Sequence, residues 1–191
     1  MKFITLPAEE LFSLPGSYLA YDTVMIDDST LQAPRTILVT GGMGFIGSAF
    51  LLRMVPKYPN YRFINVDDFR AGSNIKAIKE IMLAPNYLFR QVALEDRLES
   101  LFYDFKITDI IHFAAETDVD RSISSPRMVV GTNIASVLNL LEAARMQKEF
   151  KRFVYVSTDE IYGQAIYSAP GKVESDPQRP GNPYAASKCS C

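Results

Sequence analysis

The stretch that decides the fold is Thr36-Ile37-Leu38-Val39-Thr40, followed directly by Gly41-Gly42-Met43-Gly44-Phe45-Ile46-Gly47. Its first five residues are aliphatic or β-branched, which predicts a buried strand, and the glycines predict a tight turn into a helix that begins near Phe45. Gly42, Gly44 and Gly47 fit the pattern G-x-G-x-x-G, and Gly41 opens a second frame. Such glycines let the backbone approach a pyrophosphate, which the free N–H groups of a helix N-terminus bind. We therefore expect a dinucleotide here; the alternative is a turn that is glycine-rich for steric reasons alone.

The composition is that of an ordinary globular protein, with 191 residues, 48% hydrophobic and 22% charged side chains, and a formal net charge of −2. Without a basic excess, nucleic acid is not an expected partner. No apolar run is long enough for a membrane span, and Pro7 and Glu9 interrupt the N-terminus too early for a secretory signal. Cys189, Cys191 and a single histidine cannot complete a metal site. A cytoplasmic protein without a resident metal is therefore expected.

The chain divides into an extension and one domain. Residues 1–34 carry no recognisable motif and are expected to be a loosely ordered extension, with residues 18–26 as a possible edge strand. Residues 35–191 are expected to form a single dinucleotide-binding domain.

Strands and helices alternate along this domain. The expected later strands are residues 61–66, 87–92, 109–114 and 153–156, and the expected helices between them are residues 94–105 and 126–146. This alternation predicts an α/β fold, a Rossmann-type doubly wound parallel sheet of about five strands. His112 falls inside the fourth strand and is expected to be a packed core residue rather than an acid–base catalyst.

The long helix expected at residues 126–146 has more apolar positions than one sheet face needs. One set comprises Val130, Ile134, Val137, Leu138, Leu141 and Ala144, and a second set comprises Val129 and Leu140. The first set is expected to face the sheet, and the extra width of the stripe predicts a partner helix.

Asp67 lies twenty positions beyond Gly47, at the end of the second expected strand. A dinucleotide fold places a carboxylate there to accept hydrogen bonds from the adenosine ribose. The same carboxylate would repel a 2′-phosphate, which favours NAD over NADP, although Arg70 lies close by. The alternative is a solvated pair, Asp67-Asp68, that merely ends a strand.

Asn182-Pro183 is a typical helix start, with Asn as the N-cap and Pro at the first helical position. Tyr184 and Lys188 would then share one face of the helix, four residues apart. An ammonium beside a phenol favours the phenolate and lowers the phenol pKa, so Tyr184 is expected to serve as a base near neutral pH. The alternative is an ordinary surface helix.

These motifs together resemble the first half of an extended short-chain dehydrogenase/reductase, and most closely the NAD-dependent nucleotide-sugar 4,6-dehydratases that act on dTDP-glucose. The resemblance runs from about Thr36 to Lys188. It rests on Thr-Gly-Gly-x-Gly-Phe-Ile-Gly (40–47), His-Phe-Ala-Ala-Glu (112–116), Val-Asp-Arg-Ser (119–122), Thr-Asn-Ile (132–134), Val-Ser-Thr-Asp-Glu-Ile-Tyr-Gly (156–163) and Pro-Tyr-Ala-Ala-Ser-Lys (183–188).

The resemblance implies an NAD site and a set of catalytic residues. The implied cofactor-binding residues are Gly41, Gly44, Phe45, Ile46, Gly47, Asp67, Ala114, Ala115, Thr117, Thr132, Tyr184 and Lys188. Tyr184, tuned by Lys188, would take the proton of the sugar 4-hydroxyl while C4 gives hydride to NAD⁺. Glu160 would then remove the C5 proton and Asp159 would protonate the departing 6-hydroxyl, with Thr158 bonded at the 4-oxygen. Hydride return to C6 gives the 4-keto-6-deoxy sugar.

The chain departs from the family pattern in three places. Val92-Ala93 replaces a Gly-Asp pair whose Asp accepts from the adenine amino group, and Asp118 replaces a His. Third, the chain ends three residues after Lys188, so it is expected to be truncated, to lack the C-terminal substrate domain and to show negligible turnover alone. Its fifth strand would then be an exposed edge. The family also implies a homodimer through long helices.

Two alternatives stay open. One is a UDP-sugar epimerase or decarboxylase of the same superfamily. The other is a non-catalytic dinucleotide-binding module that associates with a full-length relative through the helix at residues 126–146. The sequence does not specify the sugar or its nucleotide.

Overall fold

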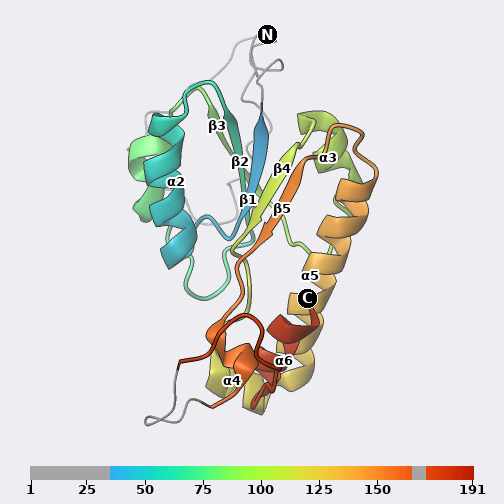
Figure 1. Cartoon of the computed structure of the whole chain (residues 1–191). Helices are drawn as coiled ribbons and strands as arrows, with labels where there is room; N and C mark the ends of the chain where they lie inside the picture. The colour runs from blue at the N-terminus through green and yellow to red at the C-terminus, as the bar shows by residue number, and fades with distance from the viewer. Residues whose placement is uncertain (1–34, 165–170) are drawn as a thin grey trace.

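The structure is a computed structural model that describes residues 35–164 and 171–191 (Figure 1). The expected extension, residues 1–34, lies outside the described residues. In the described ranges, no helix is both long and apolar enough to span a membrane.

A five-stranded parallel sheet in the order β3-β2-β1-β4-β5 forms the centre of the domain. Its strands are β1 (Thr36–Thr40), β2 (Arg62–Asp67), β3 (Tyr87–Gln91), β4 (Asp109–His112) and β5 (Arg152–Tyr155). Leu38 in β1 pairs with Ile64 of β2 on one side and with Ile110 of β4 on the other. The chain therefore winds outward from β1 in both directions, and the predicted fold class, an α/β doubly wound parallel sheet of five strands, is confirmed.

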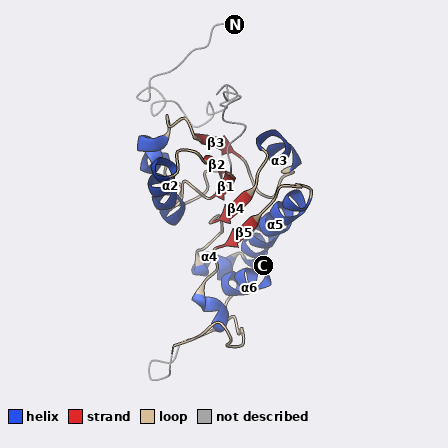
Figure 2. Cartoon of the chain, turned by 45° about the horizontal axis from the view of Figure 1, so that its top comes forward, coloured by secondary structure: helices blue, strands red, loops and turns tan. Residues whose placement is uncertain are grey.

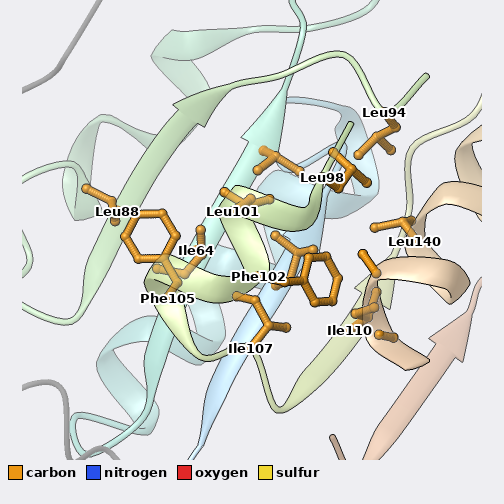
Figure 3. Close-up of a cluster of buried hydrophobic side chains, with 14 residues drawn as sticks. Ile64, Leu88, Leu94, Leu98, Leu101, Phe102, Phe105, Ile107, Ile110 and Leu140 are labelled. Carbon is orange, nitrogen blue, oxygen red and sulfur yellow. The ribbon is translucent and has the colours of Figure 1, made fainter. Parts of the chain in front are cut away.

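Helices cover both faces of this sheet (Figures 1 and 2). The helices of the described residues are α2 (Phe45–Lys57), η3 (Ile75–Ile81), α3 (Glu99–Phe105), α4 (Val119–Ser124), α5 (Pro126–Arg145), η4 (Asp159–Tyr162) and α6 (Pro183–Ser190). Of these, α2 and η3 cover one face of the sheet and α3 and α5 the other. On the α2 face, Val39 and Phe63 pack with Leu51 of α2 and Ile78 of η3. On the other face, Phe102 of α3 and Leu140 of α5 pack over the sheet (Figure 3).

Three local predictions were wrong. Residues 94–98 form turns rather than the start of a helix, although Leu94 and Leu98 are buried in the core. The fourth strand ends at His112 instead of residue 114. The fifth strand spans Arg152–Tyr155 instead of residues 153–156.

The long helix α5 faces the core with a different side from the one predicted. Its buried residues are Val129, Asn133, Ser136, Val137, Leu140, Ala143 and Ala144, whereas Leu138 is 57% exposed and Leu141 46% exposed. The helix is apolar on both sides, so its periodicity alone did not fix its rotation. Asn133 settles the rotation because it is buried and hydrogen-bonded to neighbouring elements.

The fifth strand lies at the edge of the described sheet, as expected. Its residues alternate between exposed and half-buried, and Val154 is 40% exposed. Helix α6 packs against α5 beyond the carboxyl end of the sheet (Figure 1).

Candidate active site

The glycine turn joins β1 to α2 at the carboxyl edge of the sheet. Gly41 has a positive φ of 68° and donates its N–H to the carbonyl of Val66 at 2.9 Å, and a Cβ on it would lie 2.7 Å from the backbone nitrogen of Ala114. A Cβ on Gly47 would overlap the carbonyl oxygen of Gly41. The turn can therefore close only with glycine at these two positions.

The N-terminus of α2 follows the glycine turn directly and has no side-chain cap. Gly44 is the N-cap and makes no side-chain capping hydrogen bond, and the first turn carries no acidic residue. Phe45 and Ile46 of this first turn are 92% and 59% exposed. An uncapped helix N-terminus with positive dipole potential favours an anion at this point.

The carboxylate of Asp67 ties the glycine turn to the loop after β2. One oxygen accepts from the backbone N–H of Met43 at 3.0 Å, and the other accepts from Phe69 N–H at 2.9 Å and from the Ser73 hydroxyl at 2.7 Å. A carboxylate has about four acceptor positions, so these donors leave room for a further hydroxyl. Asp67 is thus a buried, fixed acceptor rather than a solvated strand end.

A cavity of about 740 Å³ opens at the carboxyl ends of β1, β2 and β4. It is lined by every residue that the sequence assigned to the cofactor: Gly41, Gly44, Phe45, Ile46, Gly47, Asp67, Ala114, Ala115, Thr117, Thr132, Tyr184 and Lys188. This volume lies within the range of about 300–1,000 Å³ that is usual for small-molecule and cofactor sites. The chain thus brings residues from one end of the domain to the other into a single site.

Arg70 lies in the same cavity, within a cluster of carboxylates. Its guanidinium forms ion pairs with Asp68 at 2.5 Å, with Glu95 at 2.7 Å and with Glu116 at 3.7 Å. On its other side Glu116 pairs with Arg121 at 3.1 Å. Arg70, which the sequence left as a candidate for a 2′-phosphate, is therefore engaged by acidic side chains in this structure.

Sequence reasoning did not predict a structural role for Asn133. This buried residue of α5 accepts from the backbone N–H of Glu116 at 2.8 Å and donates to the carbonyl of Glu116 at 3.1 Å and to the Ser187 hydroxyl at 2.9 Å. It thereby joins the loop after β4 to α6. An Asn among the apolar residues of a helix that otherwise reads as core was the available signal.

Helix α6 places Tyr184 and Lys188 on the cavity side. Asn182 is its N-cap and accepts from the N–H of Ala185 at 2.7 Å, as predicted, and the same side chain donates to Glu160 at 2.8 Å. Tyr184 is 8% exposed and Lys188 4% exposed. The alternative, an ordinary surface helix, is thus excluded, because the face that carries Tyr184 and Lys188 is buried.

The pKa of Tyr184 runs against the prediction. Burial of the phenol raises its pKa, the carboxylate of Glu160 and more weakly that of Asp159 add to the rise, and a hydrogen bond with Thr158 opposes it. Burial in turn lowers the pKa of Lys188 to about 8. In this structure burial and the neighbouring carboxylates therefore disfavour the phenolate, contrary to the predicted effect of Lys188.

The predicted dehydration residues occupy η4 and the residue before it. Thr158 is the N-cap and its hydroxyl accepts from the N–H of Glu160 at 3.3 Å, with Asp159 exposed and Glu160 half-buried. These three residues do not line the cavity, but they are near enough to Tyr184 of α6 to change its pKa. The structure therefore brings them beside the cavity but not into its wall.

His112 is a buried core residue, as predicted. The Thr40 hydroxyl accepts from the N–H of Ala114 at 3.2 Å and is hydrogen-bonded to Nδ1 of His112, with the two atoms 2.6 Å apart. Burial and then the charge of Lys188 lower the pKa of His112 to about 3. A neutral imidazole that does not line the cavity has no acid–base role there.

The residues of this site fit a dinucleotide. The close approach of Gly41 and Gly47 shapes a turn that any side chain would obstruct, the N-terminus of α2 lacks a side-chain cap, and Asp67 holds a fixed acceptor at the end of the next strand. These are the three features with which a doubly wound sheet binds a pyrophosphate and its ribose.

Residues 38–191 match the sequence profile of the family described as GDP-mannose 4,6 dehydratase. The dTDP-glucose 4,6-dehydratase of Neisseria meningitidis serogroup B is 40% identical over 166 residues, which cover 82% of this chain and 46% of the relative. The solved dTDP-glucose 4,6-dehydratase of Bacillus anthracis in complex with NAD superposes with a TM-score of 0.72 at 35% identity, covering 82% of this chain and 47% of that one.

A solved UDP-glucose 4-epimerase from Thermotoga maritima, in complex with UDP-glucose, superposes almost as well. Its TM-score is 0.71 at 32% identity, covering 81% of this chain and 48% of the epimerase. The chain spans about half the length of the curated relatives it matches.

Proposed function

Because the chain belongs to the GDP-mannose 4,6-dehydratase family, we propose that it carries the NAD-binding half and most catalytic groups of a nucleotide-sugar 4,6-dehydratase, of the type that acts on dTDP-glucose. The observation that carries this proposal is the single cavity that gathers the glycine turn, Asp67, Tyr184 and Lys188. Membership of the family and the NAD complex of the solved Bacillus anthracis relative support it.

NAD is the proposed cofactor, held by the glycine turn, by Asp67 and by the remaining predicted residues of the cavity. When bound, NAD⁺ supplies a hydride acceptor for oxidation of the sugar at C4 and returns the hydride to C6. The engagement of Arg70 by three carboxylates supports NAD over NADP, since this guanidinium is then not free to bind a 2′-phosphate.

Tyr184 is the proposed base for the sugar 4-hydroxyl. Its pKa is raised, so loss of its proton depends on the charges of the neighbouring carboxyl groups, which oppose ionisation of the phenol. In the proposed mechanism Asp159 protonates the departing 6-hydroxyl.

Glu160 is the proposed base that removes the C5 proton. Its carboxylate accepts a hydrogen bond from Asn182 at 2.8 Å, which fixes it at the start of α6. Thr158 is proposed to bond the 4-oxygen of the sugar, and its effect in lowering the pKa of Tyr184 supports this role.

The proposal is tested by joining residues 1–191 to the C-terminal half of the Neisseria meningitidis enzyme and analysing the product from dTDP-glucose by NMR. The expected product is the 4-keto-6-deoxy sugar, and Asp159→Asn or Glu160→Gln should lower its formation by at least about a hundredfold. The 191-residue chain alone is expected to bind NAD with no detectable turnover. Product formation unaffected by both substitutions would contradict the proposal.

A UDP-sugar 4-epimerase is the second candidate. It is favoured by one observation, that Asp159 and Glu160 lie outside the cavity wall, because epimerisation at C4 needs no acid–base pair for dehydration. In the same experiment an epimerase would convert the UDP-sugar to its C4 epimer and would keep this activity in both variants.

We further propose that residues 35–191 act as one domain, preceded by a separate extension, and that the protein works as a cytoplasmic homodimer through α5. The exposed apolar side chains Leu138 and Leu141 support the homodimer. The two cysteines, both free thiols, are in keeping with a reducing compartment.

A further inference from the structure

The ammonium group of Lys188 is buried without a carboxylate partner. Lys188 is 4% exposed, and no carboxylate in the described part of the chain forms an ion pair with it. Its Nζ donates to the carbonyl oxygen of Val156 at 2.6 Å, which satisfies one of its three N–H groups. Burial of a charge is costly unless other groups compensate it, so a single carbonyl is too little.

The missing compensation is supplied by an aromatic face. The Nζ atom of Lys188 lies 4.1 Å from the centroid of the Tyr155 ring, well inside the range of about 6 Å in which a cation is attracted to a ring face. The attraction is largest where water is excluded, as it is around Lys188.

The Tyr155 ring is itself fixed in place. It stacks on the imidazole of His112 with centroids 5.7 Å apart and an interplanar angle of 21°. The Tyr155 ring, on β5, thus contacts both His112 of β4 and Lys188 of α6. The stacking on His112 restricts rotation of the ring beside the ammonium.

We propose that Tyr155 is a positioning residue whose ring takes the place of a counter-ion and holds Lys188 charged at the cavity wall. The groups that face Lys188 from the neighbouring elements are the neutral His112 of β4, Tyr155 and the Val156 carbonyl of β5, and Cys191 after α6. The role assigned to Lys188 rests on the proposed function, but the interaction with Tyr155 does not. If Tyr155 only filled space, any apolar side chain of similar size would serve equally well.

The test compares Tyr155→Phe, which keeps the ring face, with Tyr155→Leu, which removes it. The pKa of Lys188 is measured in the full ligand-free chain from NMR shifts of its Cε–Hε group, assigned with a Lys188→Met variant. In Tyr155→Phe the pKa should stay within about 0.3 unit of the original protein, and in Tyr155→Leu it should fall by about 0.5–1.5 units, because the charged form loses the ring.

A second series decides the matter should Tyr155→Leu fail to fold. Phenylalanine and 3,4,5-trifluorophenylalanine are placed at position 155; the two rings are similar in shape, but fluorine weakens the negative potential of the face. The fluorinated ring should lower the pKa of Lys188 relative to phenylalanine. An unchanged pKa on fluorination, or an unchanged pKa in a folded Tyr155→Leu, would overturn the proposal.

Failure of this inference is separable from failure of the proposed function. The Lys188 titration is carried out without ligand, whereas NAD binding is measured by calorimetry on the same samples. A chain that binds no NAD but shows the ring dependence keeps the inference and loses the proposed function. A chain that binds NAD but shows no dependence of the Lys188 pKa on the ring keeps the proposed function and loses the inference.

Discussion

At the scale of single residues, the site depends on side chains whose partners are already in place. The Asp67 carboxylate accepts three hydrogen bonds from two loops. The Thr40 hydroxyl is hydrogen-bonded both to the backbone N–H of Ala114 and to the imidazole of His112. A hydrogen bond adds only modestly to the net stability of a protein. A buried polar group that loses its partner, however, lowers the stability by its full desolvation penalty. A change at one of these residues should therefore affect both the local structure and the ligand.

Asp67→Asn should weaken NAD binding about tenfold or more and lower the free energy of unfolding by about 1–3 kcal/mol. The amide would place its N–H group against the N–H of Met43 or of Phe69, which now donate to the carboxylate. Calorimetry with NAD and urea denaturation measure the two effects. Asp104→Asn, an exposed change on α3, is the control and should alter neither. Equal NAD affinity in Asp67→Asn and in the original protein would contradict the assignment.

His112 should make the protein sensitive to mild acid. Its pKa is lowered to about 3 in the fold from an ordinary value of 6.5, so between these values the unfolded chain binds a proton that the folded chain does not. Stability is then fully present above about pH 6.5 and falls with pH by up to about 1.4 kcal/mol per unit below it. His112→Asn, which keeps an acceptor for Thr40, should remove this part of the fall. Urea denaturation of both proteins at about pH 7 and about pH 5 measures the difference; parallel losses would show that His112 does not cause it.

At the scale of elements, the parts predicted best are those that local chemistry determines. The glycine turn, the strand before it and the cap of α6 at Asn182-Pro183 each require particular residues in a short stretch, and the structure has them where the sequence indicated. The rotation of α5 and the raised pKa of Tyr184 depend on what packs against them from distant parts of the chain. No local pattern carries that information, so these predictions failed.

The glycine turn gives a matched pair of substitutions. Gly47→Ala should lower the free energy of unfolding by several kcal/mol, because its Cβ would overlap the backbone of Gly41 and cannot be relieved by moving a side chain. Gly131→Ala, in the middle of α5 with open space around the new Cβ, should raise it by about 0.5–1 kcal/mol. Urea denaturation distinguishes the two, and a harmless Gly47→Ala would show that the turn is not closed as described.

At the scale of the whole molecule, one side of the domain is built for ligand and another is left apolar. The cavity collects the carboxyl ends of the strands, whereas Leu138 and Leu141 of α5 and Val154 of β5 remain exposed. Exposed apolar side chains that cluster on one element indicate contact with another protein surface. The proposed homodimer through α5 would cover those of the helix.

Leu138→Lys combined with Leu141→Lys should therefore shift the protein from dimer to monomer in sedimentation experiments. Each lysine would place a charge in an interface that excludes water, which costs more than the lost apolar contact. Leu83→Lys, at an exposed apolar position near β3 on the opposite edge of the sheet, serves as the control and should leave the assembly unchanged. A monomeric original protein, or a dimer that survives the double substitution, would contradict the proposed interface.

The most direct test of the central claim is calorimetric titration of the 191-residue chain with NAD and, in parallel, with NADP. The account predicts a saturable one-to-one titration with NAD. The dissociation constant should be micromolar, which corresponds to a binding free energy on the order of −8 kcal/mol, and NADP should bind at least about tenfold more weakly. Gly47→Ala should abolish the NAD heat. No heat with either dinucleotide from a folded chain would contradict the claim that this cavity is a dinucleotide site.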